Sequence, residues 1–181
     1  MEETLAALRE TVSQCSACRL CETRNNVVFG KGSEHPKVLF IGEAPGEQED
    51  RQGLPFVGAA GQLLQLYLDF LGLEAEDYYI ANILKCRPPR NRDPLPEEEE
   101  ACMGWLRAQV KLLAPKVIVC LGRIAACRSL SPDFRITREH GVWFDRGGMR
   151  VMATFHPSAL LRDPAKKEAA LLDFKSILNE I

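Results

Sequence analysis

The sequence has no apolar run near the roughly 20 residues that a membrane-spanning helix needs. Its opening, Met1 to Val12, is acidic and amphipathic, and it lacks the basic start and apolar core of a secretory signal peptide. These two absences predict a protein that does not enter a membrane and that works in the cytosol.

The sequence also has no excess of positive charge, because 23 lysines and arginines stand against 25 aspartates and glutamates. The formal net charge of −2 does not indicate a nucleic-acid-binding protein, so only a local basic surface would do so. One basic cluster exists, Lys85, Arg87, Arg90 and Arg92, and the acidic run Glu97 to Glu100 follows it. The cluster fits a phosphate-binding face, and a solvated loop accounts for it equally well.

No disulfide framework is expected, because the seven cysteines are odd in number and a reducing cytosol keeps thiols free. Cys120 lies in an apolar run and Cys127 in a helical pattern. Both are interpreted as core residues, since a free cysteine packs like a small hydrophobic side chain.

Four other cysteines have the spacing of a metal centre, with a close pair, Cys15 and Cys18, and a distant pair, Cys86 and Cys102. A structural zinc site usually has two tight C-x-x-C pairs, whereas fifteen residues separate the second pair here. Thiolate ligation of an iron–sulfur cluster tolerates such spacing. Spacing alone leaves iron–sulfur and zinc open, and Cys21 is an extra cysteine that either replaces one of the four or packs in the core.

With 181 residues, of which 46% are hydrophobic, the chain is expected to form one domain over residues 1–181. Apolar, β-branched runs bounded by polar residues, glycine or proline predict buried strands. These strands are Val38 to Ile41, Tyr78 to Leu84, Val117 to Leu121, and Val151 to Phe155.

Helical periodicity predicts helices before, between and after these strands. They are Leu5 to Val12, Gln62 to Leu71, Pro96 to Leu113, Arg123 to Leu130, and Ala165 to Ile181. Strands that alternate with helices indicate an α/β fold whose parallel sheet is covered on both faces, as three α/β/α layers. In such sheets ligands bind beyond the carboxyl ends of the strands.

The sequence lacks the glycine spacing of a Walker A loop and of a dinucleotide-binding fingerprint. The first predicted strand is instead followed by GEAPGEQED, Gly42 to Asp50. Its glycines and proline predict a tight turn that directs backbone N–H groups into a cleft beside Glu43. Glu43 fits a functional carboxylate, and a solvated or helix-capping carboxylate fits equally well.

Histidine is scarce, with only three in the chain. His156 directly follows a predicted strand, where parallel sheets bind ligands, and this position favours a functional role over a structural one. His35 and His140 lie beside glycine, serine or proline and are interpreted as surface residues.

These motifs together resemble one family. GEAPGEQED with the later PFVG, NILKCRPP starting at Asn82, HPSALLR starting at His156, and the four cysteines closely resemble the family 4 uracil-DNA glycosylases. The resemblance extends from Cys15 to about Leu172, with its blocks in the family's order. It implies a four-stranded parallel sheet between helices and a structural [4Fe–4S] cluster bound by Cys15, Cys18, Cys86 and Cys102.

The resemblance implies a monofunctional enzyme of base excision repair. Such an enzyme flips uracil out of uracil-containing DNA and hydrolyses its N-glycosidic bond to leave an abasic site. As catalytic residues it implies Glu43, which would orient the attacking water, and His156, which would form a hydrogen bond to uracil O2. Phe56 would stack on the base and Asn82 would read its edge. The substrate-binding residues implied are Gly42, Ala44, Glu49, Phe56 and Asn82.

The resemblance also suggests how DNA is held. Basic side chains would contact phosphates, and leucines would enter the gap that the flipped base leaves. The implied DNA-binding residues are Lys85, Arg87, Leu160, Leu161 and Arg162. For the two leucines, the buried start of a helix is an equal alternative.

Two further expectations complete the interpretation. A sister group carries an Arg-rich insertion ending in a histidine that bonds covalently to the sugar, and no such insertion lies between Ser131 and Gly141. Irreversible capture of DNA is therefore not expected, and a monomer is the simplest assembly. The alternative function is a non-catalytic, metal-containing nucleic-acid-binding module in which GEAPG is only a turn.

Overall fold

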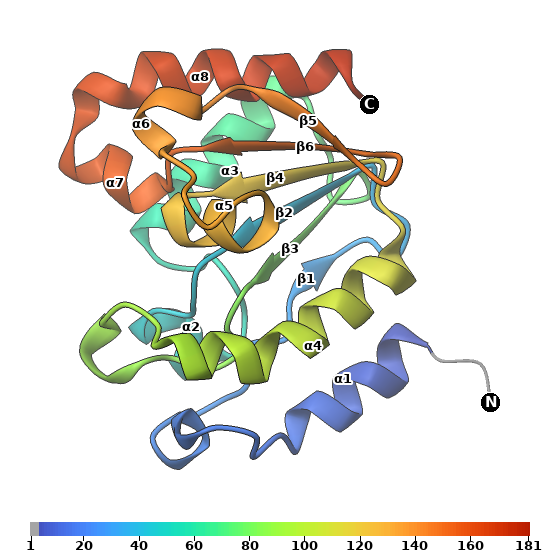
Figure 1. Cartoon of the computed structure of the whole chain (residues 1–181), viewed down its shortest axis with the longest axis vertical. Helices are drawn as coiled ribbons and strands as arrows, with labels where there is room; N and C mark the ends of the chain where they lie inside the picture. Colours follow the sequence, from blue (N-terminus) through green and yellow to red (C-terminus); the bar gives the residue numbers. More distant parts are fainter. Residues whose placement is uncertain (1–3) are drawn as a thin grey trace.

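The computed structural model describes residues 4–181 as a sheet of six strands with helices on both faces (Figure 1). The strand order is β1-β3-β2-β4-β6-β5. The strands are β1 (Lys31–Gly32), β2 (Val38–Gly42), β3 (Tyr78–Asn82), β4 (Val117–Leu121), β5 (Trp143–Arg146) and β6 (Met149–Thr154).

The four central strands run parallel, as the alternation of strands and helices predicts. The edge strands β1 and β5 are antiparallel to their neighbours, so the sheet is mixed and has two more strands than expected. Both additions lack a sequence signal, because β1 has only two residues, both exposed, and no residue of β5 is fully buried.

The helices are α1 (Leu5–Ser13), α2 (Glu47–Gln52), α3 (Ala59–Leu71), α4 (Pro96–Leu113), α5 (Arg123–Ser129), α6 (Ile136–Glu139), α7 (Pro157–Arg162) and α8 (Lys167–Ser176). Short 3₁₀ turns occupy Arg19–Glu22, Pro89–Asn91, Pro164–Lys166 and Ile177–Asn179. The long helix expected at the C-terminus is therefore divided into α8 and two 3₁₀ turns. The short helices α2 and α6 were not expected, and α7 corresponds to the helix start that was one alternative for Leu160 and Leu161.

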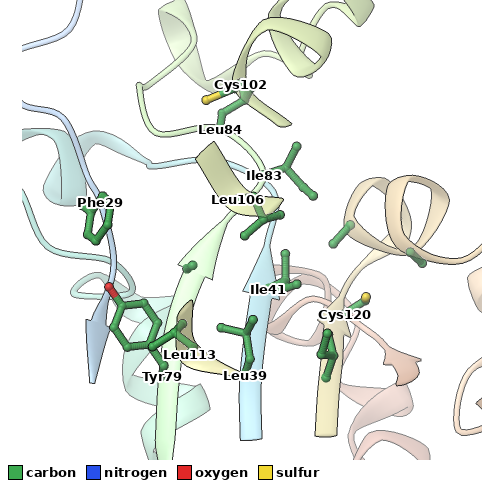
Figure 2. Packing of buried hydrophobic residues seen from close by; sticks show 14 of the residues in the cluster. Phe29, Leu39, Ile41, Tyr79, Ile83, Leu84, Cys102, Leu106, Leu113 and Cys120 are labelled. Carbon is green, nitrogen blue, oxygen red and sulfur yellow. The ribbon is translucent and has the colours of Figure 1, made fainter. Parts of the chain in front are cut away.

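Alternation along the strands directs side chains into two separate cores. In β2, Val38 and Phe40 pack with α3, α7 and α8, whereas Leu39 and Ile41 pack with α1, α4 and α5. Figure 2 shows Leu39 and Ile41 in one buried cluster with Leu106 and Leu113 of α4, and Leu39 next to Leu113. This arrangement forms the three α/β/α layers and leaves the carboxyl ends of the parallel strands at one edge of the sheet.

The strand expected at Tyr78 to Leu84 ends at Asn82, but its backbone pairing continues. The N–H of Ile83 donates to the Gly42 oxygen at 2.9 Å, and that of Leu84 donates to the Glu43 oxygen at 3.0 Å. The GEAPG turn and the NILKC segment are therefore joined by backbone hydrogen bonds.

No helix within residues 4–181 is both long and apolar enough to cross a membrane.

The aromatic core beneath β2 provides a test of the packing. Phe40 is completely buried and stacks on Phe174 of α8 at 6.1 Å between ring centroids. We expect Phe40→Ala to lower the free energy of unfolding by about 3–5 kcal/mol in urea denaturation, because it leaves a cavity. Phe70→Ala, at a ring that is 59% exposed, is the matched control and should cost less than about 1 kcal/mol. Equal losses would contradict this packing.

Candidate active site and cysteine cradle

A cleft of about 510 Å³ opens at the carboxyl ends of β2, β3, β4 and β6. It brings together three of the expected site residues, Glu43, Asn82 and His156, which lie at or shortly after the ends of β2, β3 and β6. Other expected site residues that line it are Ala44, Glu49, Phe56 and Arg162. A carboxylate, a carboxamide and an imidazole thus face one cavity.

Asn82 is the last residue of β3 and pairs in register with Gly42 of β2. Its side chain is only 2% exposed, and its Oδ1 has no hydrogen-bond partner among the described residues. A buried amide oxygen without a partner is costly, so this acceptor is suited to a donor from a bound molecule. Gly42 is required beside it, because a Cβ there would lie 2.4 Å from Oδ1 and 2.9 Å from the Phe56 ring.

Phe56 forms an aromatic wall of the cleft on a strained backbone. Its φ of 52° lies in the left-handed region, which bulky residues rarely adopt. Gly61 permits this turn, since a Cβ at that position would lie 1.8 Å from the Phe56 carbonyl oxygen. Glu49 fixes the turn from the other side, because its Oε1 accepts from the N–H groups of Val57 at 2.9 Å and Gly58 at 3.0 Å.

His156 lies across from Phe56, with 5.5 Å between ring centroids. Its Nδ1 accepts the backbone N–H of Ser158 at 3.1 Å and contacts the Ser158 hydroxyl at 2.7 Å. Because Nδ1 accepts, the neutral ring carries its proton on Nε2 and can donate it. Burial, and next the positive charge of Arg162, lower the pKa of His156 to about 4, so the ring is neutral near pH 7.

Gly122 provides the space for this histidine. It follows β4 with a φ of 94°, and a Cβ there would lie 2.9 Å from the Cβ of His156. No sequence pattern shows that glycine is required at position 61 or 122, because each requirement arises from a contact with a distant segment.

Glu43 is half-buried directly after β2. Burial, and next the negative charge of Asp93, raise the pKa of its carboxyl to about 7 against the opposing positive charge of Arg123. Asp93 and Arg123 also line the cleft and lie 3.4 Å apart. Glu43 is therefore able to exchange a proton near neutral pH.

Some of the residues expected to contact DNA are exposed and others are buried. Arg162 lines the cleft and is exposed, and Leu161 is 43% exposed beside it. Leu160 is completely buried in the core, so the alternative of a buried helix start holds for it and it cannot serve as a wedge. Arg87 is partly exposed, and its Nε donates to Asn91 Oδ1 at 2.7 Å.

Lys85 requires a correction. Its side chain is 1% exposed, and its Nζ donates to the backbone oxygen of Asn82 at 2.9 Å. Burial lowers its pKa to about 8, against the opposing effect of the Cys102 and Cys86 sulfurs. Lys85 is therefore not on the surface and is not placed to contact a phosphate.

Charged residues of the basic cluster and of the acidic run after it form ion pairs within the protein. Arg92 makes hydrogen bonds of 2.9 and 2.6 Å to Glu98, which accepts the N–H of Leu95 at the start of α4. Glu99 is buried and pairs with Arg128. Two members of the acidic run are therefore structural.

The other histidines differ from one another. His35 is exposed, as expected. His140 is partly buried, with its Nδ1 2.8 Å from Oδ2 of the buried Asp173, so its interpretation as a surface residue was wrong. The same carboxylate accepts the Thr154 hydroxyl at 2.6 Å, which links the end of β6 to α8.

Five cysteines line a second pocket, here called the cysteine cradle: Cys15, Cys18, Cys21, Cys86 and Cys102. Cys21 thus lies beside the four expected ligands. Cys120 is fully buried in the core and Cys127 packs against it, as their sequence positions predict. In residues 4–181, no three histidine, cysteine, aspartate or glutamate side chains are arranged so that they could hold a metal ion.

The surroundings of the cradle nevertheless fit thiolate ligands. Three N–H groups donate to sulfur: Trp105 Nε1 to Cys15 at 3.3 Å, Arg24 Nη1 to Cys86 at 3.5 Å, and the backbone N of Lys85 to Cys102 at 3.3 Å. Burial raises the pKa of Cys86 to about 11, so a thiolate there needs compensating positive charge. Donors of this kind stabilise metal-bound sulfur.

Comparisons with known proteins give one consistent family. The family model described as "Uracil DNA glycosylase superfamily" matches residues 29–179. A type-4 uracil-DNA glycosylase of Archaeoglobus fulgidus is 45% identical, over 97% of this chain and 92% of that protein. One of Thermotoga maritima is 47% identical, over 90% and 85%. A type-5 uracil-DNA glycosylase of Pyrobaculum aerophilum is 33% identical, over 71% and 64%.

The contact between Gly61 and Phe56 gives a test of the cleft wall. We expect Gly61→Ala to lower the free energy of unfolding by about 2–3 kcal/mol, because the added methyl group displaces the strained turn. Gly104→Ala is the control, since Gly104 lies on α4 and a Cβ there would enter open space. That change should stabilise the protein by up to about 1 kcal/mol in urea denaturation. A neutral effect of Gly61→Ala would argue against the turn described here.

Proposed function

The chain belongs to the uracil DNA glycosylase superfamily, within its type-4 group, and we propose that it removes uracil from DNA by hydrolysing the N-glycosidic bond. The reaction leaves an abasic site for base excision repair. The supporting observation is the single cleft that contains Glu43, Asn82 and His156. A base stacked inside DNA is out of reach of these groups, so the nucleotide must be flipped into the cleft.

Recognition of uracil follows from Asn82 and Phe56. The unpartnered Oδ1 of Asn82 accepts the N3–H of uracil, while the amide NH₂ donates to O4. Cytosine has an acceptor at N3 and a donor at N4. It would therefore place an acceptor against the Asn82 Oδ1 and a donor against the Asn82 NH₂. Phe56 provides the flat surface on which the base stacks.

His156 stabilises the departing base. Cleavage passes through an oxocarbenium-like sugar while negative charge collects on uracil. The neutral ring, with Nδ1 occupied by Ser158, donates from Nε2 to uracil O2 as that charge develops. A fixed donor of this type contributes about 3 kcal/mol to transition-state stabilisation.

Glu43 acts on the opposite side of the reaction. As a carboxylate it orients the attacking water and places negative charge near the cationic sugar. Its raised pKa also makes it able to accept a proton from that water. Gly42 and Ala44 shape the pocket beside it, and Glu49 acts through the Phe56 turn.

The cysteine cradle is proposed to hold a [4Fe–4S] cluster through Cys15, Cys18, Cys86 and Cys102. Such a cluster would supply cross-links among three chain segments and no electron transfer, because glycosidic hydrolysis changes no oxidation state. The sulfur-directed donors of Trp105, Arg24 and Lys85 support this assignment. Free thiols persist in a reducing compartment, so we propose that the protein works in the cytoplasm.

DNA is proposed to lie along the mouth of the cleft. Arg162, Arg87 and Arg123 offer positive charge to phosphates, and the exposed Leu161 replaces the flipped base in the stack. The protein is proposed to act as a monomer. A non-catalytic binding module would not require an imidazole, a carboxamide and a carboxylate in one cleft, so this alternative is disfavoured.

The proposal is tested with oligonucleotides that carry a single U, T, C or hypoxanthine. After incubation with the protein, alkali cleaves the strand at abasic sites and reveals them. We expect cleavage at uracil and none at T or C. His156→Ala should lower the uracil rate by about 10²–10³-fold, because it removes a transition-state donor. Asn179→Ala, in the exposed C-terminal turn, is the control and should leave the rate unchanged. An inactive wild-type protein would refute the function, and a fully active His156→Ala variant would refute the role of His156.

The pH dependence of kcat/KM tests the role of Glu43. Its pKa of about 7 belongs to an acid, so the active carboxylate is present above that pH and is lost below it. We expect kcat/KM to fall about tenfold per unit below pH 7 and to be level above it, since His156, with a pKa of about 4, does not titrate there. Glu43→Gln should have a low kcat/KM that does not fall further below pH 7. A wild-type profile that is flat from pH 5.5 to 9 would exclude the carboxylate role.

A further inference from the structure

Lys85 is a buried cation without a carboxylate partner. It is 1% exposed, and no salt bridge in the described part of the chain includes it. Taking an ammonium group out of water costs several kcal/mol unless an opposite charge lies nearby. The groups that can supply this charge are the sulfurs of Cys86 and Cys102 in the cradle that Lys85 lines.

The backbone of Lys85 ties the residue to the cradle as well. Its N–H donates to the Cys102 sulfur at 3.3 Å, and its carbonyl oxygen accepts the N–H of Val28 at 2.8 Å. Lys85 is therefore held in place by a strand-end segment, by α4 and by the N-terminal loop.

The other end of Lys85 reaches the backbone of Asn82, whose side chain belongs to the active-site cleft. Its Nζ donates to the carbonyl oxygen of Asn82 at 2.9 Å, while the N–H of the same peptide group, on Ile83, donates to Gly42 at 2.9 Å. Both polar atoms of the Asn82–Ile83 peptide are thus fixed. Because this peptide sets the direction of the Asn82 side chain, it also sets where the unpartnered Oδ1 points.

We propose that Lys85 is a positioning residue that couples the cysteine cradle to base recognition. Its ammonium group, balanced by cradle thiolates, locks the peptide of Asn82 and so aligns the amide that reads uracil. This inference rests on the proposed function. It assigns Lys85 a role inside the protein in place of a phosphate contact.

The test uses Lys85→Met, which keeps the volume and removes both the charge and the donor. We expect the visible absorption of the iron–sulfur protein to bleach about tenfold faster under a chelator, as for other partners of metal ligands. We also expect free uracil, assayed as an inhibitor or by direct titration, to bind about tenfold more weakly. Lys111→Met, on the exposed surface of α4, is the matched control and should change neither quantity.

A double-mutant cycle with Asn82→Ala separates positioning from general damage. If Lys85 acts through Asn82, the tenfold loss in uracil binding should shrink to less than about twofold in the Asn82→Ala background. If Lys85→Met does not fold, the same double-mutant cycle is measured with Lys85→Gln, which retains an amide donor and lacks the charge. It should bleach as fast as Lys85→Met and bind uracil with intermediate affinity.

The outcomes distinguish the two proposals. Three results would overturn the role of Lys85. The first is an equal loss of uracil affinity in the wild-type and Asn82→Ala backgrounds, and the second is an unchanged rate of bleaching. The third is a wild-type chain that takes up no iron and sulfide on reconstitution. A wild-type protein that fails to cleave uracil-containing DNA would overturn the proposed function, and uracil cleavage with a normal Lys85→Met variant would overturn only the coupling.

Discussion

The parallel pairing of β2 with β3 is the constraint on which the site depends. It places Gly42 opposite Asn82, and the backbone bonds from Ile83 and Leu84 extend the pairing beyond the end of β3. A one-residue slip of this register would turn the Asn82 side chain to the opposite face of the sheet and remove it from the cleft. The same extension leads directly into Cys86, so one segment serves both the cleft and the cysteine cradle.

The sequence predicts the parallel centre of the fold well because its signals are local. Val117 to Leu121 and Pro96 to Leu113 were placed with their observed bounds, since continuous apolar runs and a proline-initiated amphipathic pattern mark them. The edge strands could not be found in this way. The pair Lys31–Gly32 is too short to show periodicity and exists because its backbone pairs with β3.

The candidate site was predicted to a similar extent. Glu43 and His156 were found because each follows a predicted strand, and parallel topology brings such residues to one edge. Asn82 lies inside the strand predicted at Tyr78 to Leu84, so only the family resemblance identified it. Lys85 was assigned to DNA from its charge, and charge does not reveal burial. The needs for Gly61 and Gly122 arise from close approaches to Phe56 and His156, which only three-dimensional proximity defines.

The origin of the cradle imposes an order on biosynthesis. Its thiols come from the loop after α1, from the segment after β3, and from α4. During translation the early cysteines emerge long before their partner on α4, so they wait as exposed, oxidisable thiols until the ribosome has produced more than half of the chain. The pocket therefore cannot be completed before α4 has been made, by which point the segments of β2 and β3 are already part of the chain.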